Sequence, residues 1–332
     1  MRLDEPEKRL LQIGRGCFSV NDVAGAGVSQ ARVRALVTSG VLFRIGRGVF
    51  ASADQLERLD PWEAHAVRAR GFARSFTSAW VAGWSAVAVR KLRRLGPAPE
   101  VPTLVVPSSG RSGSDESPYG VVRHCALPES YRGQYAGCPV VASSWLAIDL
   151  ARHVSRPASL VVVDGVLASG TSRPGLLSAH EHIRTWPGSS RSAWAVEHGD
   201  PRSESVLETL GRWICIDRGL PVPLSNVWVG LDRPVYRVDH LWPWHWVVAE
   251  ADGALKYRAG DAAAVVREEK ERQWYLEQEL GLRVVRYGWD LAARSPATLA
   301  ERFSKALANA GRRETPIRWW ADPRELTHLG VR

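Results

Sequence analysis

The chain has 332 residues, 45% of them hydrophobic, and a formal net charge of +9. This length allows two or three domains with separate cores, and no apolar run reaches the roughly 18 residues that a membrane span needs. The N-terminus has no apolar segment followed by a cleavage site, and the four scattered cysteines form no CxxC pair. We therefore expect a cytoplasmic protein with no disulfide framework, no zinc knuckle and no membrane partner.

Arginine supplies nearly all of the positive charge, because the chain holds only five lysines. A guanidinium group binds phosphate bidentately, so the charge favours DNA as a partner. A genome rich in G and C would also favour arginine codons, so the bias alone does not establish that partner.

Residues 1–55 predict a winged helix-turn-helix. Serines 19 and 29 can cap helices, Gly40 can end one, and Gly46–Arg47–Gly48 can form a turn. The expected elements are helices Glu5–Ile13, Val20–Ala24 and Gln30–Ser39, then strands Val41–Ile45 and Val49–Ala51. In this arrangement the third helix enters the major groove of DNA.

Four side chains of this segment are candidate DNA contacts. Gln30, Arg32 and Arg34 would lie on the outward face of the third helix, and Arg47 would lie at the tip of the wing. The alternative is a small helical domain whose arginines are only solvated.

Residues 61–195 predict an α+β middle domain. We expect a mobile Ser/Gly-rich loop over Ser108–Gly120, and regular elements at Phe76–Leu92 (helix), Thr103–Val106 and Val121–Leu127 (strands), and Trp145–Arg152 and Ala158–Leu167 (helices). His180, Glu181 and His182 cannot share one metal easily, since neighbouring helical positions point about 100° apart, so we interpret them as surface residues.

The first 195 residues resemble AbiEi-type antitoxins of type IV toxin–antitoxin systems. The resemblance rests on LVTSGVLFRIGRGVFAS in the N-terminal segment, and on FTSAWVAGWSAVAVRKL and CPVVASSWLAIDLARHVSRPASLVVVDGVLASG in the middle region. It implies a DNA-binding regulatory module, and a cognate toxin or another protein is a candidate partner.

Residues 200–312 predict a C-terminal α/β domain, followed by a tail at 313–332. Ser203 can cap a helix at Glu204–Ile216. The further expected elements are strands Asn226–Val229, Val235–Leu241 and His245–Ala249, helix Ala262–Leu280, strand Leu282–Tyr287 and helix Pro296–Ala310, an order typical of a compact mixed sheet.

Two of these strands end in carboxylates. Asp239 ends one apolar run, and Glu250 and Asp252 end the next, on one strand face at period two. An unpaired carboxylate in an apolar interior is costly, so two such strand ends favour a shared divalent cation. The alternative is ion pairing with arginines such as Arg237 or Arg286.

Residues 200–295 resemble the restriction-endonuclease-like PD-(D/E)xK superfamily, near the very-short-patch repair endonucleases. The matching segments are Ser203–Glu204, Val238–Asp239, Glu250–Gly253, Glu268–Arg272 and Val284–Arg286. The resemblance implies that Asp239 and Glu250 hold Mg²⁺, with Glu204 as a third acid, for phosphodiester hydrolysis.

One position departs from the superfamily pattern. Asp252 stands where the superfamily has its catalytic lysine, and Lys256 is the nearest replacement in sequence. Helical phasing places Glu269 and Gln273 inward, so we expect both to complete the polar shell around the acids. His240 and His245, which flank the hairpin, are further candidate bases.

Two functions remain open at this stage. The chain is an α/β multidomain protein that either cleaves DNA with Mg²⁺ or regulates transcription through a nuclease fold that no longer cleaves.

Overall fold

The computed structural model describes residues 1–253, 262–322 and 324. The chain divides into two compact units, one formed by residues 1–162 with 170–197, and the other by residues 163–169 with the chain from 198 onward. Among the described residues, no helix is both long and apolar enough to span a membrane.

Residues 5–52 form three helices and a three-stranded sheet with strand order β1-β3-β2. Capping contacts set two helix starts: Ser29 Oγ accepts the N–H of Arg32 at 3.1 Å, and the Asp22 carboxylate accepts the N–H of Ser19 at 2.7 Å. The elements are α1 (Glu5–Ile13), β1 (Cys17–Ser19), α2 (Val20–Ala24), α3 (Gln30–Thr38), β2 (Leu42–Gly46) and β3 (Val49–Ser52). The predicted helices and hairpin are confirmed to within one residue, and β1, which pairs with β3, is an addition.

These elements share one apolar core, formed by Leu10, Leu11, Phe18, Val23, Val33, Leu36, Leu42 and Phe50. Val33 and Leu36 face this core from α3, so the same helix turns Gln30 and Arg34 to its exposed side.

Residues 53–198 combine helices with a six-stranded sheet of order β6-β7-β5-β4-β9-β8. The elements are α4 (Ala53–Arg58), α5 (Pro61–Ala73), β4 (Trp80–Val81), α6 (Gly83–Arg90), β5 (Thr103–Pro107), β6 (Gly113–Ser117), β7 (Gly120–Cys125), η1 (Glu129–Tyr131), β8 (Arg132–Tyr135), β9 (Cys138–Val141), α7 (Ser143–Ala151), α8 (Arg156–Ala168), α9 (Arg173–Glu181) and α10 (Ser189–His198).

Two predictions for this region are wrong. The helix expected over 76–92 is shorter, because Trp80–Val81 pairs with β5 and β9 and Gly83 starts the helix with a positive φ of 54°. The loop expected over 108–120 contains strand β6, which pairs antiparallel with β7. Pairing partners distant in sequence override the local composition in both cases.

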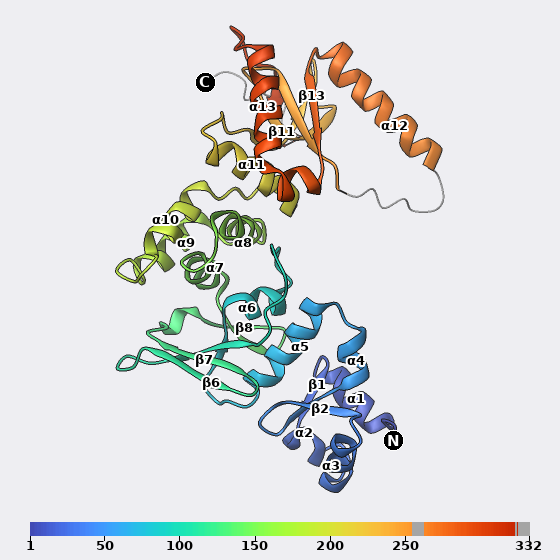
Figure 1. The fold of residues 1–332 in the computed structure, drawn as a ribbon, viewed down its shortest axis with the longest axis vertical. Coiled ribbons are helices and arrows are strands. Elements are labelled where there is room, and N and C mark those ends of the chain that lie inside the picture. The colour runs from blue at the N-terminus through green and yellow to red at the C-terminus, as the bar shows by residue number, and fades with distance from the viewer. Residues whose placement is uncertain (254–261, 323, 325–332) are drawn as a thin grey trace. The chain divides into compact units, whose positions relative to one another are not determined.

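The second unit holds a five-stranded sheet of order β13-β12-β11-β10-β14, in which only the β12–β13 pair is parallel among the described strands. Figure 1 shows α13 and α12 flanking this sheet. The elements are α11 (Val206–Asp217), β10 (Leu224–Val229), β11 (Tyr236–Trp242), β12 (Val247–Ala251), α12 (Ala262–Trp274), η2 (Tyr275–Glu279), β13 (Arg283–Tyr287), η3 (Asp290–Arg294), α13 (Pro296–Ala310) and β14 (Trp319–Trp320).

The predicted order of elements is confirmed here, with local differences. Helix α11 begins at Val206 rather than at Glu204, and α12 continues from Trp274 as a π-helical turn. The tail contributes β14, the edge strand of the sheet, which pairs with β10 through Trp228 and Trp320. This mixed α/β architecture places the carboxyl ends of β12 and β13 side by side.

Candidate functional site

Asp239 and Glu250, which we call the acid pair, lie where β11 and β12 stop pairing. The antiparallel register joins Trp242 to Val247, and His240 to Ala249, so one further residue places Asp239 opposite Glu250. Here the Asp239 carboxylate accepts the backbone N–H of Ala251 at 2.8 Å. At this point, which we call the strand fork because the two strands stop pairing there, a side-chain carboxylate accepts the N–H that a backbone carbonyl would accept in a regular sheet.

Helix α12 brings a guanidinium to this fork. Val248 packs in one cluster with Leu276, and strand alternation puts Glu250 on the same face as Val248. Arg272 lies one helical turn before Leu276, and it donates to Glu250 Oε1 at 2.8 Å and to the carbonyl of Arg237 at 2.8 Å. Arg272 therefore supplies a cation beside the acid pair.

Burial sets the electrostatics of the acid pair. It raises the pKa of Glu250 from 4.5 to about 7, against the lowering effect of Arg272 and with a further rise from the charge of Asp239. Burial also raises the pKa of Asp239, which the hydrogen bond from Ala251 lowers. Both carboxylates thus pay a desolvation cost that an additional cation would relieve.

Glu208, which the sequence argument missed, takes the place expected for Glu204. The hydroxyl of Ser205 caps α11 by accepting the N–H of Glu208 at 3.1 Å, and Glu208 is buried and close enough to raise the pKa of Asp239. Glu204 instead forms an ion pair with Arg237 and has 55% of its side chain exposed. The signal for Glu208 was the capping-box spacing of Ser205 and Glu208.

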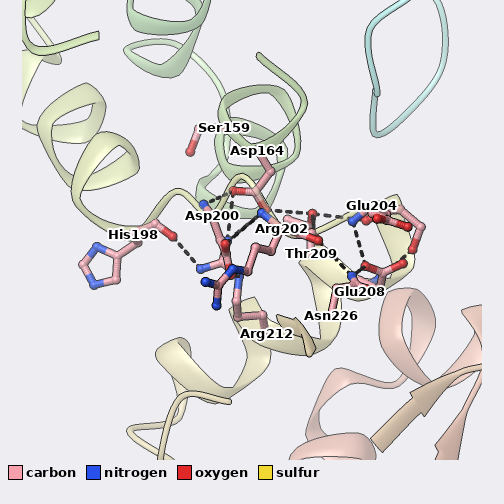
Figure 2. Close-up of polar contacts among 12 residues, drawn as sticks. Ser159, Asp164, His198, Asp200, Arg202, Glu204, Glu208, Thr209, Arg212 and Asn226 are labelled. Atoms are coloured by element: carbon pink, nitrogen blue, oxygen red, sulfur yellow. Dashed lines mark hydrogen bonds and ion pairs between the residues drawn. The ribbon is translucent and has the colours of Figure 1, made fainter. Parts of the chain in front are cut away.

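A buried network fixes the start of α11 (Figure 2). Arg212 donates to Asp164 at 2.8 and 3.0 Å, and Asp164 also accepts from the hydroxyl of Thr209 and from the N–H of Asp200, at 2.9 and 2.7 Å. Four hydrogen bonds from three donor groups thus satisfy a fully buried carboxylate. This network anchors the turn that carries Glu208.

Glu208 itself joins α11 to β10. Its carboxylate accepts the backbone N–H of Glu204 at 2.7 Å and the side-chain amide of Asn226, and Asn226 also donates to the carbonyl of Arg202 at 2.8 Å. These bonds occupy Glu208 with protein donors. Consistent with this, no group of three or more His, Cys, Asp or Glu among the described residues is placed to hold a metal ion.

Two other predicted site residues, Asp252 and Glu269, bond to Arg286 rather than to the acid pair, and Arg286 is the register partner of Glu250 and lowers its pKa. Arg286 forms ion pairs with both Asp252, at 3.2 Å, and Glu269. Gln273 is exposed and donates to Glu277, so its predicted inward direction is wrong. Leu276 and Leu280 are the buried residues of this stretch, and Glu269 has 44% of its side chain exposed. Lys256 lies outside the described residues.

The two histidines of the hairpin differ in environment. His240 is fully buried, its ring nitrogen Nε2 lies 2.8 Å from the hydroxyl of Tyr287, and burial lowers its pKa to about 3. Its partner and its low pKa indicate a neutral packing residue. Burial and, to a lesser extent, Arg312 lower the pKa of His245 as well.

The four candidate DNA contacts in the N-terminal segment differ in exposure, because one of them pairs with residues at the start of α1. Gln30, Arg34 and Arg47 are exposed, whereas Arg32, with 26% of its side chain exposed, pairs with Asp4 at 2.8 Å and with the buried Glu7 at 3.0 Å. Arg32 therefore ties α3 to α1, and three of the four predicted side chains remain available to a ligand.

Comparisons with known proteins agree with the N-terminal part of this description. Residues 5–53 match the sequence family described as "Transcriptional regulator, AbiEi antitoxin", which is well under half of the chain. Two uncharacterized proteins of Mycobacterium tuberculosis, MT2308 of strain CDC 1551 and Rv2248 of strain H37Rv, are each 30% identical over 177 residues. The match covers 53% of this chain and 64% of each relative.

Among solved structures, the RV2827C protein from Mycobacterium tuberculosis matches at 14% identity with a TM-score of 0.33, over 59% of this chain and 78% of that one. This likeness supports no conclusion about function. The N-terminal segment is thus similar to AbiEi-type transcriptional regulators.

Proposed function

We propose that the protein is a DNA-binding regulator that contacts duplex DNA through residues 5–53. The observation that carries the proposal is the exposed face of α3. Gln30 and Arg34 extend from that face, and Arg47 lies at the turn between β2 and β3. A helix of this kind presents its polar face to base edges in the major groove, and an arginine on a wing contacts the backbone. The family match over the same residues supports the proposal.

Selection of bound duplexes from a random pool, followed by fluorescence anisotropy on the enriched sequence, tests this proposal. Arg34→Ala is expected to weaken binding about tenfold or more, since one arginine contact to a base contributes about 1–3 kcal/mol. Arg47→Ala is expected to reduce the slope of log affinity against log salt by about 1. Arg302→Ala removes an exposed charge of the other unit and serves as the control. Equal affinities for all four proteins would contradict DNA binding by this segment.

We propose a second function, metal-dependent phosphodiester hydrolysis, for the second unit. The specific observation in its favour is the acid pair, two partly desolvated carboxylates opposite each other at a strand fork. Mg²⁺ takes oxygen ligands and needs only one or two protein carboxylates. Asp239 and Glu250 would hold it, because Asp239 uses one oxygen for Ala251 and Glu250 uses one for Arg272, which leaves one oxygen on each. When bound, Mg²⁺ neutralises phosphate charge and lowers the pKa of a water molecule.

Arg272 would position the phosphate group for the reaction. Arg272, held between Glu250 and the carbonyl of Arg237, would orient a phosphate oxygen next to the acid pair, the task that the superfamily assigns to lysine. A guanidinium stays charged at every relevant pH, so it can stabilise negative charge but cannot act as a base. Glu250 would act in its ionised form, because a carboxylate must lose its proton to hold a cation.

Two measurements test this second function. Supercoiled, linear and mismatched duplexes are incubated with Mg²⁺ or Mn²⁺, and calorimetry records metal binding without DNA. Asp239→Ala and Glu250→Ala are expected to abolish cleavage and to weaken metal binding, while Glu204→Ala leaves both unchanged because its carboxylate is exposed and paired with Arg237. If the wild type binds duplex DNA and cleaves none of these substrates, the second unit is a non-catalytic part of a regulator, as its Arg286 ion pairs also favour.

A further inference from the structure

A second candidate site lies in the first unit, far in sequence from both proposed functions. A cavity of about 800 Å³ opens beside β7, between the loop that follows β5 and the segment at Trp186. This volume falls within the range of about 300–1,000 Å³ that is typical of small-molecule sites. The loop provides residues 108–114, of which four are serines and two are glycines.

The charged side chains that line the cavity are all basic. Arg111, Arg123, Arg152 and His124 line the cavity, and none of the described lining residues is acidic. The nearest carboxylates lie behind the wall or at its rim. Such a lining attracts anions, because the guanidinium groups offer planar, paired donors.

Hydrogen bonds hold Arg123 and Arg152, which form the back wall of the cavity. The buried Asp149 accepts from Arg123 at 2.9 Å and from Arg152 at 2.7 Å, so one carboxylate serves two guanidiniums. Arg152 also donates to the carbonyl of Pro187 at 2.9 Å and lies over the ring of Trp186, 5.0 Å from its centroid. These bonds hold both arginines in place without neutralising them fully.

The rim is held by β6. Asp115 pairs with Arg111 and lies 2.9 Å from His124, and the hydroxyl of Ser108 accepts the N–H of Arg111 at 2.9 Å. Because Arg111 has 56% of its side chain exposed, its pair with Asp115 is screened by water and exchanges easily for another anion. Three guanidiniums against two carboxylates leave the site with an excess positive charge.

We propose that this cavity binds a small phosphorylated ligand of nucleotide size. Arg111 and Arg123 would hold the phosphate, together with hydroxyl groups of the serine loop. The volume exceeds the needs of a lone phosphate ion, and the half-buried Trp186 provides an apolar surface for an organic part. The same phosphate chemistry exists in a free nucleotide and in a nucleic-acid strand, and we commit to the free nucleotide because a volume of about 800 Å³ suits a single small molecule.

Isothermal titration calorimetry of the full chain tests the proposal with three probes: ATP, inorganic phosphate and a short oligothymidylate. ATP is expected to bind more tightly than phosphate. Arg111→Ala should lower the affinity for ATP about tenfold to a hundredfold, as expected for one charge-assisted hydrogen bond. Arg184→Ala is the matched control, since Arg184 is also an exposed member of an ion pair in this unit but does not line the cavity.

A second variant separates a loss of ATP binding from a loss of folding. Both terminal nitrogens of Arg123 donate to Asp149, at 2.9 and 3.4 Å. Arg123→Lys keeps a cation beside Asp149 but removes the planar guanidinium, so it should weaken ATP binding while circular dichroism stays that of the wild type. No ATP binding by the wild type, or equal ATP binding by the wild type and both variants, would overturn the proposal. Binding of phosphate as tightly as ATP, or of oligothymidylate alone, would overturn it as well, in favour of an ion site or a strand site.

Discussion

Glu250→Gln is expected to stabilise the protein at pH 8 and to leave its stability unchanged near pH 4.5. The pKa of Glu250 rises from 4.5 to about 7 in the folded state, mainly because the carboxylate is buried. Between these two values the folded state holds a proton that the unfolded state has released. Stability therefore falls as the pH rises through this window, and the loss is complete above pH 7.

The magnitude follows from the width of the window. At 1.36 kcal/mol per pKa unit, a rise from 4.5 to about 7 corresponds to about 3 kcal/mol of destabilisation by the ionised Glu250 at pH 8. Glutamine keeps the shape and an oxygen for Arg272, so the variant should recover much of that amount. The remaining cost is the weaker hydrogen bond from Arg272 to a neutral amide.

Urea unfolding of the wild type and of Glu250→Gln, followed by circular dichroism at several pH values between 4.5 and 8, measures this difference. The two curves of stability against pH should diverge as the pH rises. Glu204→Gln is the control, because its largely exposed carboxylate should give no such divergence. A variant that is destabilised equally at every pH would refute the argument that Glu250 is a desolvated carboxylate.

Three further substitutions test other parts of the structure. Arg212→Ala should cost about 3–5 kcal/mol in urea unfolding, because it leaves the buried Asp164 without its cation; a cost below 1 kcal/mol would contradict this. Arg32→Ala should lower stability by about 1–3 kcal/mol, because it removes the partner of the buried Glu7. Thermal unfolding measures this loss with the exposed Arg34→Ala as the control, and equal stabilities of the two variants would show that Arg32 is only solvated. Arg272→Ala should raise the pKa of an acid-pair carboxylate further, seen by NMR titration; an unchanged titration would show that the guanidinium does not act on the pair.

Local signals in the sequence were sufficient for much of the fold. Ser29 caps a helix, Gly48 turns a hairpin with a φ of 68°, and strand alternation places Asp239 and Glu250 on the same face of neighbouring strands, although Asp239 lies in the middle of β11 rather than at its end. Each of these features depends on residues within a few positions of each other, where backbone geometry and side-chain period determine the outcome. The acid pair was therefore predictable, as were the exposed Gln30 and Arg34.

The sequence by itself thus determined the order of the main elements in the N-terminal segment and in the second unit, the capped N-terminal helices and the neighbouring positions of Asp239 and Glu250. Only the tertiary structure decided the partners of these groups: Arg272 bonds Glu250, the buried Glu208 rather than Glu204 raises the pKa of Asp239, and Arg32 pairs with Glu7 of α1. These contacts join residues at least 18 positions apart in most cases, as for the bond from Asn226 to Glu208. No local period encodes such a pairing, because it depends on how helices pack on the sheet and on which carboxylates burial leaves in need of a cation.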